Sequence, residues 1–188
     1  MKKILVVAGP SGIGKTYLAE LLMTRFPGVF EQGDWYTTRQ PRPNEVFTDR
    51  IFVSESEFLK REKAGQFFIA EKFHDNWYGL PNSLFQKNKH VIVNTWPGLI
   101  PRFIDKKGTL LLGLTVEPES SLNLLKARMA KRGYTEKQML ERLELAQKDI
   151  NDMNSVASNI LQNGKIFTIK DNSTLGIEVI PWVETQIF

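Results

Sequence analysis

Residues 4–16 read Ile4-Leu5-Val6-Val7-Ala8-Gly9-Pro10-Ser11-Gly12-Ile13-Gly14-Lys15-Thr16. The first five form a short apolar run bounded by glycine, as in a strand that is buried on both faces. Positions 9–16 fit the pattern G-x-x-x-x-G-K-[ST], whose glycines let backbone N–H groups turn towards a polyphosphate. Residues 17–26 carry the apolar stripe of an amphipathic helix. A strand, a glycine loop and a helix in this order predict a phosphate-binding loop.

The residue types within this loop predict a role for each position. The helix that begins near Lys15 adds its positive N-terminal end to the site. The Lys15 ammonium is expected against the β- and γ-phosphates of ATP, and the Thr16 hydroxyl is expected to hold Mg²⁺. The remaining ATP-binding positions, which contribute mainly backbone amides, are Gly9, Ser11, Gly12, Ile13 and Gly14. The expected cofactor is therefore Mg²⁺, with ATP as the phosphate donor.

Composition narrows the class of protein. The chain has 188 residues, enough for one well-cored domain, and no cysteine, which excludes disulfides and thiolate metal sites. Its net charge is +4, but the basic residues are interleaved with acids, which favours an anionic small-molecule partner over nucleic acid. The apolar N-terminal run is short and lacks a cleavage site, and no stretch reaches the ~20 apolar residues of a membrane span. We expect a cytoplasmic protein; nothing indicates its oligomeric state.

The rest of the chain alternates strands with helices, which predicts an α/β fold with a parallel sheet flanked by helices. Residues 34–88 break the alternation and are expected to form a small mixed subdomain inserted in the core. Residues 32–50 read as one long loop. Further strands are expected at 67–72, 76–79, 90–94, 109–116 and 165–169. Helices are expected at 54–64, 81–87, 117–132, from 135 to about 150, and at 174–188 with an interruption at Pro181.

A second anion site is suggested by residues 37–42, Thr-Thr-Arg-Gln-Pro-Arg. Arg39 and Arg42 offer two guanidinium groups, which suit a bidentate grip on a phosphate monoester. The buried strands end in Asn94 and Val116 rather than in the aspartate of motor ATPases, and no guanine-reading Asn-Lys-x-Asp occurs. Two anion sites favour a kinase that acts on a phosphorylated small molecule.

With these motifs in order, the chain resembles the guanylate kinase family over nearly its whole length. The matching positions are 9–16, 37–42, Glu45, Phe58, 65–67, 77–79, Arg128, 132–133, 142–143 and Asn163. The resemblance implies a P-loop NTPase core at 1–33 and 89–188. It also implies an acceptor-binding subdomain at about 34–88 and a helical lid at about 126–145 that closes over ATP.

The resemblance also implies site residues, position by position. Arg39, Arg42 and Tyr78 match positions that hold the acceptor's phosphate, and Arg50 falls where the family has a phosphate-binding tyrosine. Arg128, Arg132 and Arg142 match lid arginines that reach the ATP phosphates or stack on adenine. Asn163 matches a residue beside the adenine ring. The residues expected to act on the transferring group are Lys15, Arg39, Arg132 and Arg142.

Departures from the family pattern fall on the positions that read the base. Trp35 and Leu80 replace serines, Ile69 replaces the guanine-reading glutamate, and Asn94 replaces an acidic strand end. A buried isoleucine would leave the N1–H and amino donors of guanine unpaired, which argues against guanine specificity. Glu71, two residues on and on the same strand face, is the one substitute available nearby.

Three functions remain open on these residues. The leading one is a nucleoside monophosphate kinase. Residues 78–81 and 93–94 look more like the ribose 1,5-bisphosphate phosphokinases of the same superfamily, which form phosphoribosyl pyrophosphate. A non-catalytic, guanylate-kinase-like protein-binding module is the third, although such modules have eroded phosphate loops, whereas Lys15 and Thr16 are intact here.

Overall fold

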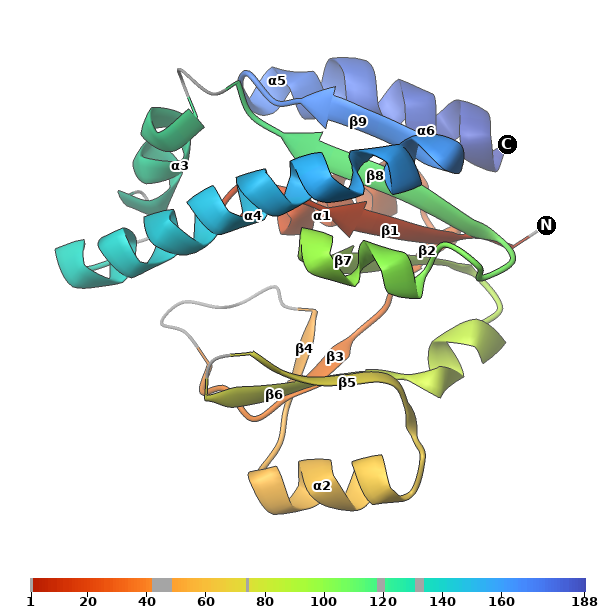
Figure 1. Cartoon of the computed structure of the whole chain (residues 1–188). Coiled ribbons are helices and arrows are strands. Elements are labelled where there is room, and N and C mark those ends of the chain that lie inside the picture. The colour runs from red at the N-terminus through yellow and green to blue at the C-terminus, as the bar shows by residue number, and fades with distance from the viewer. Residues whose placement is uncertain (1, 42–48, 74, 118–120, 131–133) are drawn as a thin grey trace.

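The core is a five-stranded parallel sheet in the order β2-β7-β1-β8-β9 (Figure 1). The computed structural model describes residues 2–41, 49–73, 75–117, 121–130 and 134–188. The strands are β1 (Ile4–Ala8), β2 (Phe30–Gln32), β7 (His90–Thr95), β8 (Thr109–Thr115) and β9 (Gly164–Thr168). Every pairing in this sheet is parallel, which confirms the predicted α/β architecture.

All five residues of β1 are buried, and side chains alternate across a sheet, so both faces of this strand are covered. Leu5 and Val7 point into one core cluster, with the apolar residues of α1 (Lys15–Arg25), α3 (Ser121–Ala130) and α6 (Ile180–Ile187). Ile4, Val6 and Ala8 point into the other, with η2 (Pro97–Arg102) and the second half of α4 (Glu136–Gln162). The sheet is thus covered on both sides, as the continuous apolar run predicts.

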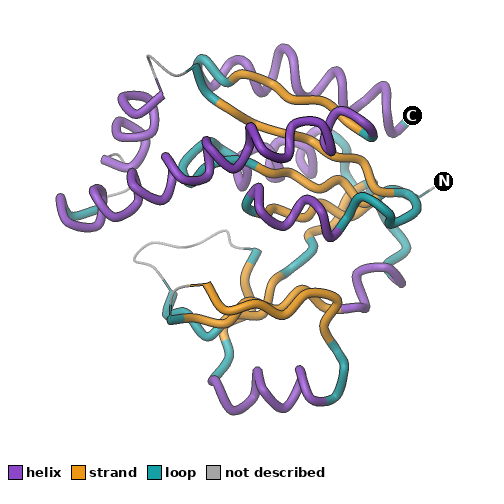
Figure 2. Tube along the Cα trace, viewed as in Figure 1, coloured by secondary structure: helices purple, strands orange, loops and turns teal. Residues whose placement is uncertain are grey.

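Two of the helices, which Figure 2 draws in purple, begin where their capping residues predict. Ser54 accepts the backbone N–H of Glu57 at the start of α2 (Glu55–Lys63). Thr135 and Gln138 form a complete capping box at the start of α4, which runs well past the predicted Ile150. The C-terminal helix is not broken at Pro181. Instead α5 (Asn172–Thr174) continues through a π-helical turn, η3 (Leu175–Val179), into α6, which carries Pro181 in its first turn.

A second, mixed sheet lies below the core in Figure 1, with the strand order β4-β3-β6-β5. Its strands are β3 (Trp35–Thr37), β4 (Arg50–Phe52), β5 (Phe67–Phe73) and β6 (Asn76–Pro81), with α2 on its far side and a 3₁₀ helix η1 (Asn82–Gln86) leading back to β7. The prediction of one long loop at 32–50 is wrong in its described part. That stretch contains the end of β2, all of β3 and the start of β4.

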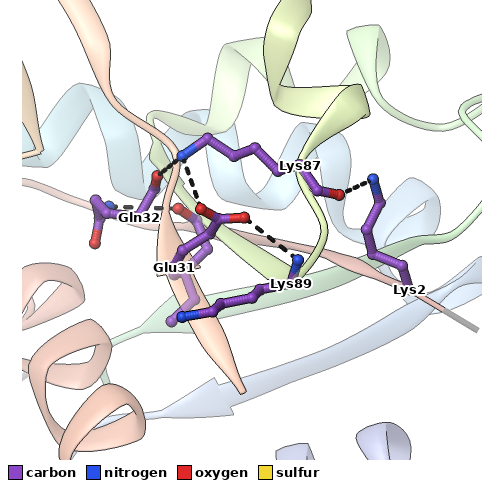
Figure 3. Close-up of polar contacts among 6 residues, drawn as sticks. Lys2, Glu31, Gln32, Lys87 and Lys89 are labelled. Atoms are coloured by element: carbon purple, nitrogen blue, oxygen red, sulfur yellow. Dashed lines mark hydrogen bonds and ion pairs between the residues drawn. The ribbon is translucent and has the colours of Figure 1, made fainter. Parts of the chain in front are cut away.

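A polar cluster joins the edge of the core sheet to the segment that returns from the second sheet (Figure 3). Lys87 Nζ donates to the backbone oxygen of Gln32 at 2.7 Å and pairs with the Glu31 carboxylate at 3.4 Å. Lys2 Nζ donates to the backbone oxygens of Phe85 and Lys87. The short strand β2 is therefore held by side chains as well as by its pairing with β7.

No helix within the described part of the chain combines the length and apolarity that a bilayer span requires.

Candidate active site

The phosphate-binding loop connects the carboxyl end of β1 to the first turn of α1. Gly12 and Gly14 have φ angles of 84° and 109°, left-handed conformations that favour glycine. A Cβ atom on Gly9 would lie 2.5 Å from the backbone oxygen of Leu114, so only glycine lets the loop approach β8 this closely. The structure therefore gives the loop the backbone conformation that the motif requires. Lys15 Nζ donates to the backbone oxygen of Gly9 at 2.6 Å, which holds the ammonium over the loop.

Two arginines from the helices that follow β8 contact this loop. Arg142 Nη1, on α4, donates to Ser11 Oγ at 3.1 Å, and its guanidinium stacks on the Tyr134 ring at 4.5 Å. Arg128 Nη1, on α3, donates to the backbone oxygen of Ile13 at 2.7 Å. Two of the three predicted lid arginines therefore lie at the loop. The third, Arg132, lies outside the described residues.

Asp149, which the sequence analysis missed, also reaches the loop. It lies two helical turns after Arg142 on α4, and its carboxylate lies beside Ser11 and close to the Lys15 ammonium. Burial raises the pKa of Asp149 to about 6, although the Lys15 charge and the Ser11 backbone act in the opposite direction. The i, i+7 spacing from Arg142 was the one available signal, because it places both residues on one helix face.

A cleft of about 420 Å³ opens in front of the loop. It is bounded by the loop, by one face of α4 and by the near end of the β5–β6 hairpin. Its lining residues are Ser11, Phe73, Asn76, Tyr78, Trp96, Tyr134, Gln138, Glu141, Arg142, Leu145 and Asp149. The cleft therefore joins the phosphate loop directly to the second sheet.

Of the predicted acceptor-binding residues, Tyr78 lines this cleft and the others that are described do not. The Arg39 guanidinium lies over the Phe52 ring at 5.1 Å and donates to the backbone oxygen of Gln40. Arg50 pairs with Asp49 at 2.7 Å. Arg42 lies outside the described residues. The structure thus brings Tyr78 to the phosphate loop but does not place Arg39 and Arg50 beside it.

Aromatic rings form one wall of the cleft. Trp96 stacks on Phe73 at 5.3 Å and contacts the Tyr78 ring edge to face at 5.9 Å. Trp35, at 5.6 Å from Trp96, is completely buried and belongs to the core. Of these two tryptophans, only Trp96 lines the cleft.

Asn163 does not lie near the loop. It ends α4 and immediately precedes β9, so it lies at the amino end of the strand. The phosphate-binding loop lies at the carboxyl ends of the parallel strands. The assignment of Asn163 to the adenine site is therefore wrong, and the residues that leave β9 at the correct end are Ile169 and Lys170.

A buried polar junction links the two sheets behind the cleft. Asp49 pairs with Arg50 and accepts a 3.1 Å hydrogen bond from Asn94 Nδ2 at the end of β7. Trp35 Nε1 donates to the backbone oxygen of Asn94 at 2.9 Å. Burial raises the pKa of the nearby Asp34 carboxyl, with a lysine acting against the shift. Asp49 thus supplies the carboxylate of this junction, and the Asn94 side chain donates a hydrogen bond to it.

The donor set at the loop fits a hard divalent cation. Thr16 offers a hydroxyl, and Asp149 offers a carboxylate close to Lys15. Mg²⁺ prefers oxygen ligands and usually takes one or two from the protein, completing its shell with phosphates and water. Within the described residues no group of three or more acidic or histidine side chains gathers.

Comparisons with known proteins agree with this geometry. The family profile described as Guanylate kinase matches residues 1–169. A guanylate kinase of Chlamydia felis is 32% identical over 154 residues, covering 76% of this chain and 71% of that protein. A guanylate kinase of Wolbachia sp. subsp. Brugia malayi is 30% identical over 155 residues, covering 79% of this chain and 78% of the relative.

A solved structure has the same fold. The crystal structure of guanylate kinase from Anaplasma phagocytophilum superposes with a TM-score of 0.68, covering all of this chain and 87% of that one at 17% sequence identity. The comparisons lend no support to a ribose bisphosphate kinase or to a non-catalytic module. The chain belongs to the guanylate kinase family of ATP-dependent phosphotransferases.

Proposed function

We propose that the protein transfers the γ-phosphate of ATP to the phosphate of GMP. The observation that carries this proposal is the single cleft that Ser11 and Arg142 share with Tyr78, because in-line transfer needs both anions in one space. The names of the relatives support guanine as the base. These names argue against the expectation that Ile69 excludes guanine.

On the donor side, the chain's own groups neutralise and orient the triphosphate. The loop amides and Lys15 would hold the β- and γ-phosphates, and Thr16 would hold Mg²⁺, which supplies charge neutralisation when bound. Arg142, whose Nη1 is 3.1 Å from Ser11 Oγ, would stabilise the charge that develops on the transferring group. Lys15, Arg142 and Arg128 bring three positive charges to the loop.

On the acceptor side, no general base is required, because the attacking oxygen belongs to an ionised phosphate. The Tyr78 hydroxyl would donate a hydrogen bond to that phosphate. We assign acceptor binding to residues 34–88 and the lid to residues 126–145, and closure of these two segments would bring Arg39 towards the phosphates and exclude water. Arg42 and Arg132, which lie outside the described residues, keep the roles that the resemblance implies.

Glu71 is the carboxylate that we assign to the guanine edge. It lies directly opposite Tyr78 across the β5–β6 pair, so both side chains emerge on the same face of the sheet. Ile69, two residues earlier, is buried in the core, whereas Glu71 is one-third exposed and held by Arg102 at 3.1 Å. A positioned carboxylate can accept from the N1–H and the amino group of guanine together.

An ADP-release assay with Mg-ATP and a panel of acceptors tests the proposal. GMP should be the best of GMP, AMP, UMP, dTMP and ribose 1,5-bisphosphate. Glu71→Gln should lower kcat/KM for GMP by roughly 10²-fold or more and leave AMP little changed, because guanine donors lose their carboxylate. Glu57→Gln, which breaks an exposed ion pair with Arg61 on α2, is the matched control.

The outcomes separate the parts of the proposal. Turnover of another nucleotide but not of GMP would reject guanine specificity while keeping the kinase. Turnover of the sugar bisphosphate alone would reject the nucleotide acceptor. A GMP preference that survives in Glu71→Gln would reject the role given to Glu71.

A further inference from the structure

One face of α4 looks into the cleft and ends at the phosphate loop. Gln138, Arg142, Leu145 and Asp149 follow one another at three- and four-residue intervals, and all of them line the cleft. Arg142 donates to the Ser11 side chain, and Asp149 lines the cleft beside Ser11. The helix therefore presents a positive and a negative group to the same loop residue.

The contacts of Asp149 are with groups that a phosphate-binding loop offers to its ligand. Its carboxylate lies beside Ser11, whose amide belongs to the loop, and is close enough to the Lys15 ammonium for the two charges to interact. A phosphate held by that amide and that ammonium would therefore lie beside the Asp149 carboxylate. Two negative groups at such short range, in a partly buried site, repel each other strongly unless a cation lies near both.

We propose that Asp149 makes ATP binding depend on Mg²⁺, by disfavouring the metal-free nucleotide at the loop and by facing the metal of the Mg-ATP complex. This inference rests on the proposed use of ATP as donor. The carboxylate comes from α4 and not from the core strand β7, where Asn94 stands in place of the family's acidic residue. Magnesium's preference for oxygen ligands supplies the chemistry. Asp149 is thus a positioning residue on the donor side, distinct from the groups that hold the acceptor.

Isothermal titration calorimetry of ATP, without acceptor, tests this by binding rather than by turnover. The ratio of Kd in EDTA to Kd with excess Mg²⁺ is measured for the wild type and for Asp149→Asn. We expect the Kd of Asp149→Asn for metal-free ATP to be lower than that of the wild type by about tenfold or more. The ratio of the two Kd values should therefore also be smaller by about tenfold or more. Asp149→Glu, which keeps the charge, should keep most of the ratio.

Glu144→Gln is the matched control, because Glu144 is exposed on α4 and is not among the residues that line the cleft. It should keep the wild-type ratio. An Asp149→Asn variant whose circular dichroism is native and whose ratio equals that of the wild type overturns the inference. Absence of ATP binding by the wild type in both conditions overturns the proposed function instead.

Discussion

At the scale of single residues, Lys15 is the group on which transfer should depend most directly. Its Nζ lies 2.6 Å from the backbone oxygen of Gly9, over the loop that would hold the triphosphate. Lys15→Ala removes the positive charge that faces the transferring phosphate, and we expect kcat to fall by about 10²–10³-fold with every acceptor. Steady-state ADP release measures this. Lys60→Ala, an exposed change on α2, should keep full activity. An equally active Lys15→Ala enzyme would contradict the mechanism.

The sequence predicts single residues well where the chemistry lies in consecutive positions. Glycines at fixed offsets from Lys15 are enough to predict the loop, because the loop's backbone conformation is local. Asp149 was missed because its role depends on its position beside Ser11, a residue that is distant in sequence but adjacent in space. Asn163 was misplaced because one asparagine near a weakly matched strand cannot indicate which end of the strand it occupies.

At the scale of elements, Gly79 sets how closely β6 packs against its neighbour. A Cβ atom there would lie 2.7 Å from the Phe67 ring, which is closer than carbon atoms can approach. Gly79→Ala should therefore lower the free energy of unfolding by about 1–3 kcal/mol and weaken acceptor binding, since Tyr78 is adjacent. Urea unfolding and the KM for the acceptor check both effects. Gly176→Ala, where no atom lies within 4 Å of the added Cβ, should show neither.

The start of β7 should make stability depend on pH. His90 Nδ1 accepts the backbone N–H of Lys3 at 3.0 Å, which requires an unprotonated nitrogen. Burial and nearby positive charge, including Lys3, lower the pKa of His90 from 6.5. Since the folded pKa is depressed, this contribution is present above 6.5 and is lost as the pH falls from 6.5 through the folded pKa. The wild type should lose more Tm than His90→Gln between about pH 7.5 and pH 5. Equal losses would contradict this assignment.

Long, capped elements could be predicted from the sequence, and short paired ones could not. The capping residues Ser54 and Thr135 identify the starts of α2 and α4 because their hydrogen bonds span only three residues. Strands β3 and β4 have three residues each, too few for a period of two to be seen. They form because Thr37 pairs with Tyr78 and Phe52, which are distant in sequence.

At the scale of the whole molecule, the sequence predicts two units but not how they are joined. The alternation of strands and helices, and its interruption at 34–88, are properties of composition along the chain. The junction depends on contacts between Asp49 and Asn94, on different sheets, and on the Trp35 indole that bonds to the same strand end. Such contacts exist only in the assembled fold. The fold explains why Asn94 stands where the family has an acid, because its amide donates to the Asp49 carboxylate opposite.

Asn94→Asp tests that explanation. The substitution would place a second carboxylate against the buried Asp49 carboxylate and remove the 3.1 Å hydrogen bond between them. Arg50, which already pairs with Asp49 at 2.7 Å, cannot neutralise both charges. We expect the free energy of unfolding at neutral pH to fall by about 2–4 kcal/mol, measured by urea denaturation. The loss should be smaller at low pH, where one carboxyl is protonated.

A double-mutant cycle distinguishes this charge repulsion from a simple packing defect. Asp49→Asn alone leaves Arg50 without its carboxylate and should also destabilise the protein. In the combined Asn94→Asp and Asp49→Asn variant the acid and the amide exchange places, so the hydrogen bond can form again and much of the stability should return. Asn151→Asp, on the exposed side of α4, controls for the added charge and should change stability little. Losses that simply add in the double variant would mean that Asn94 and Asp49 do not act as a pair, and that the two sheets are held together by the apolar contacts of Trp35 instead.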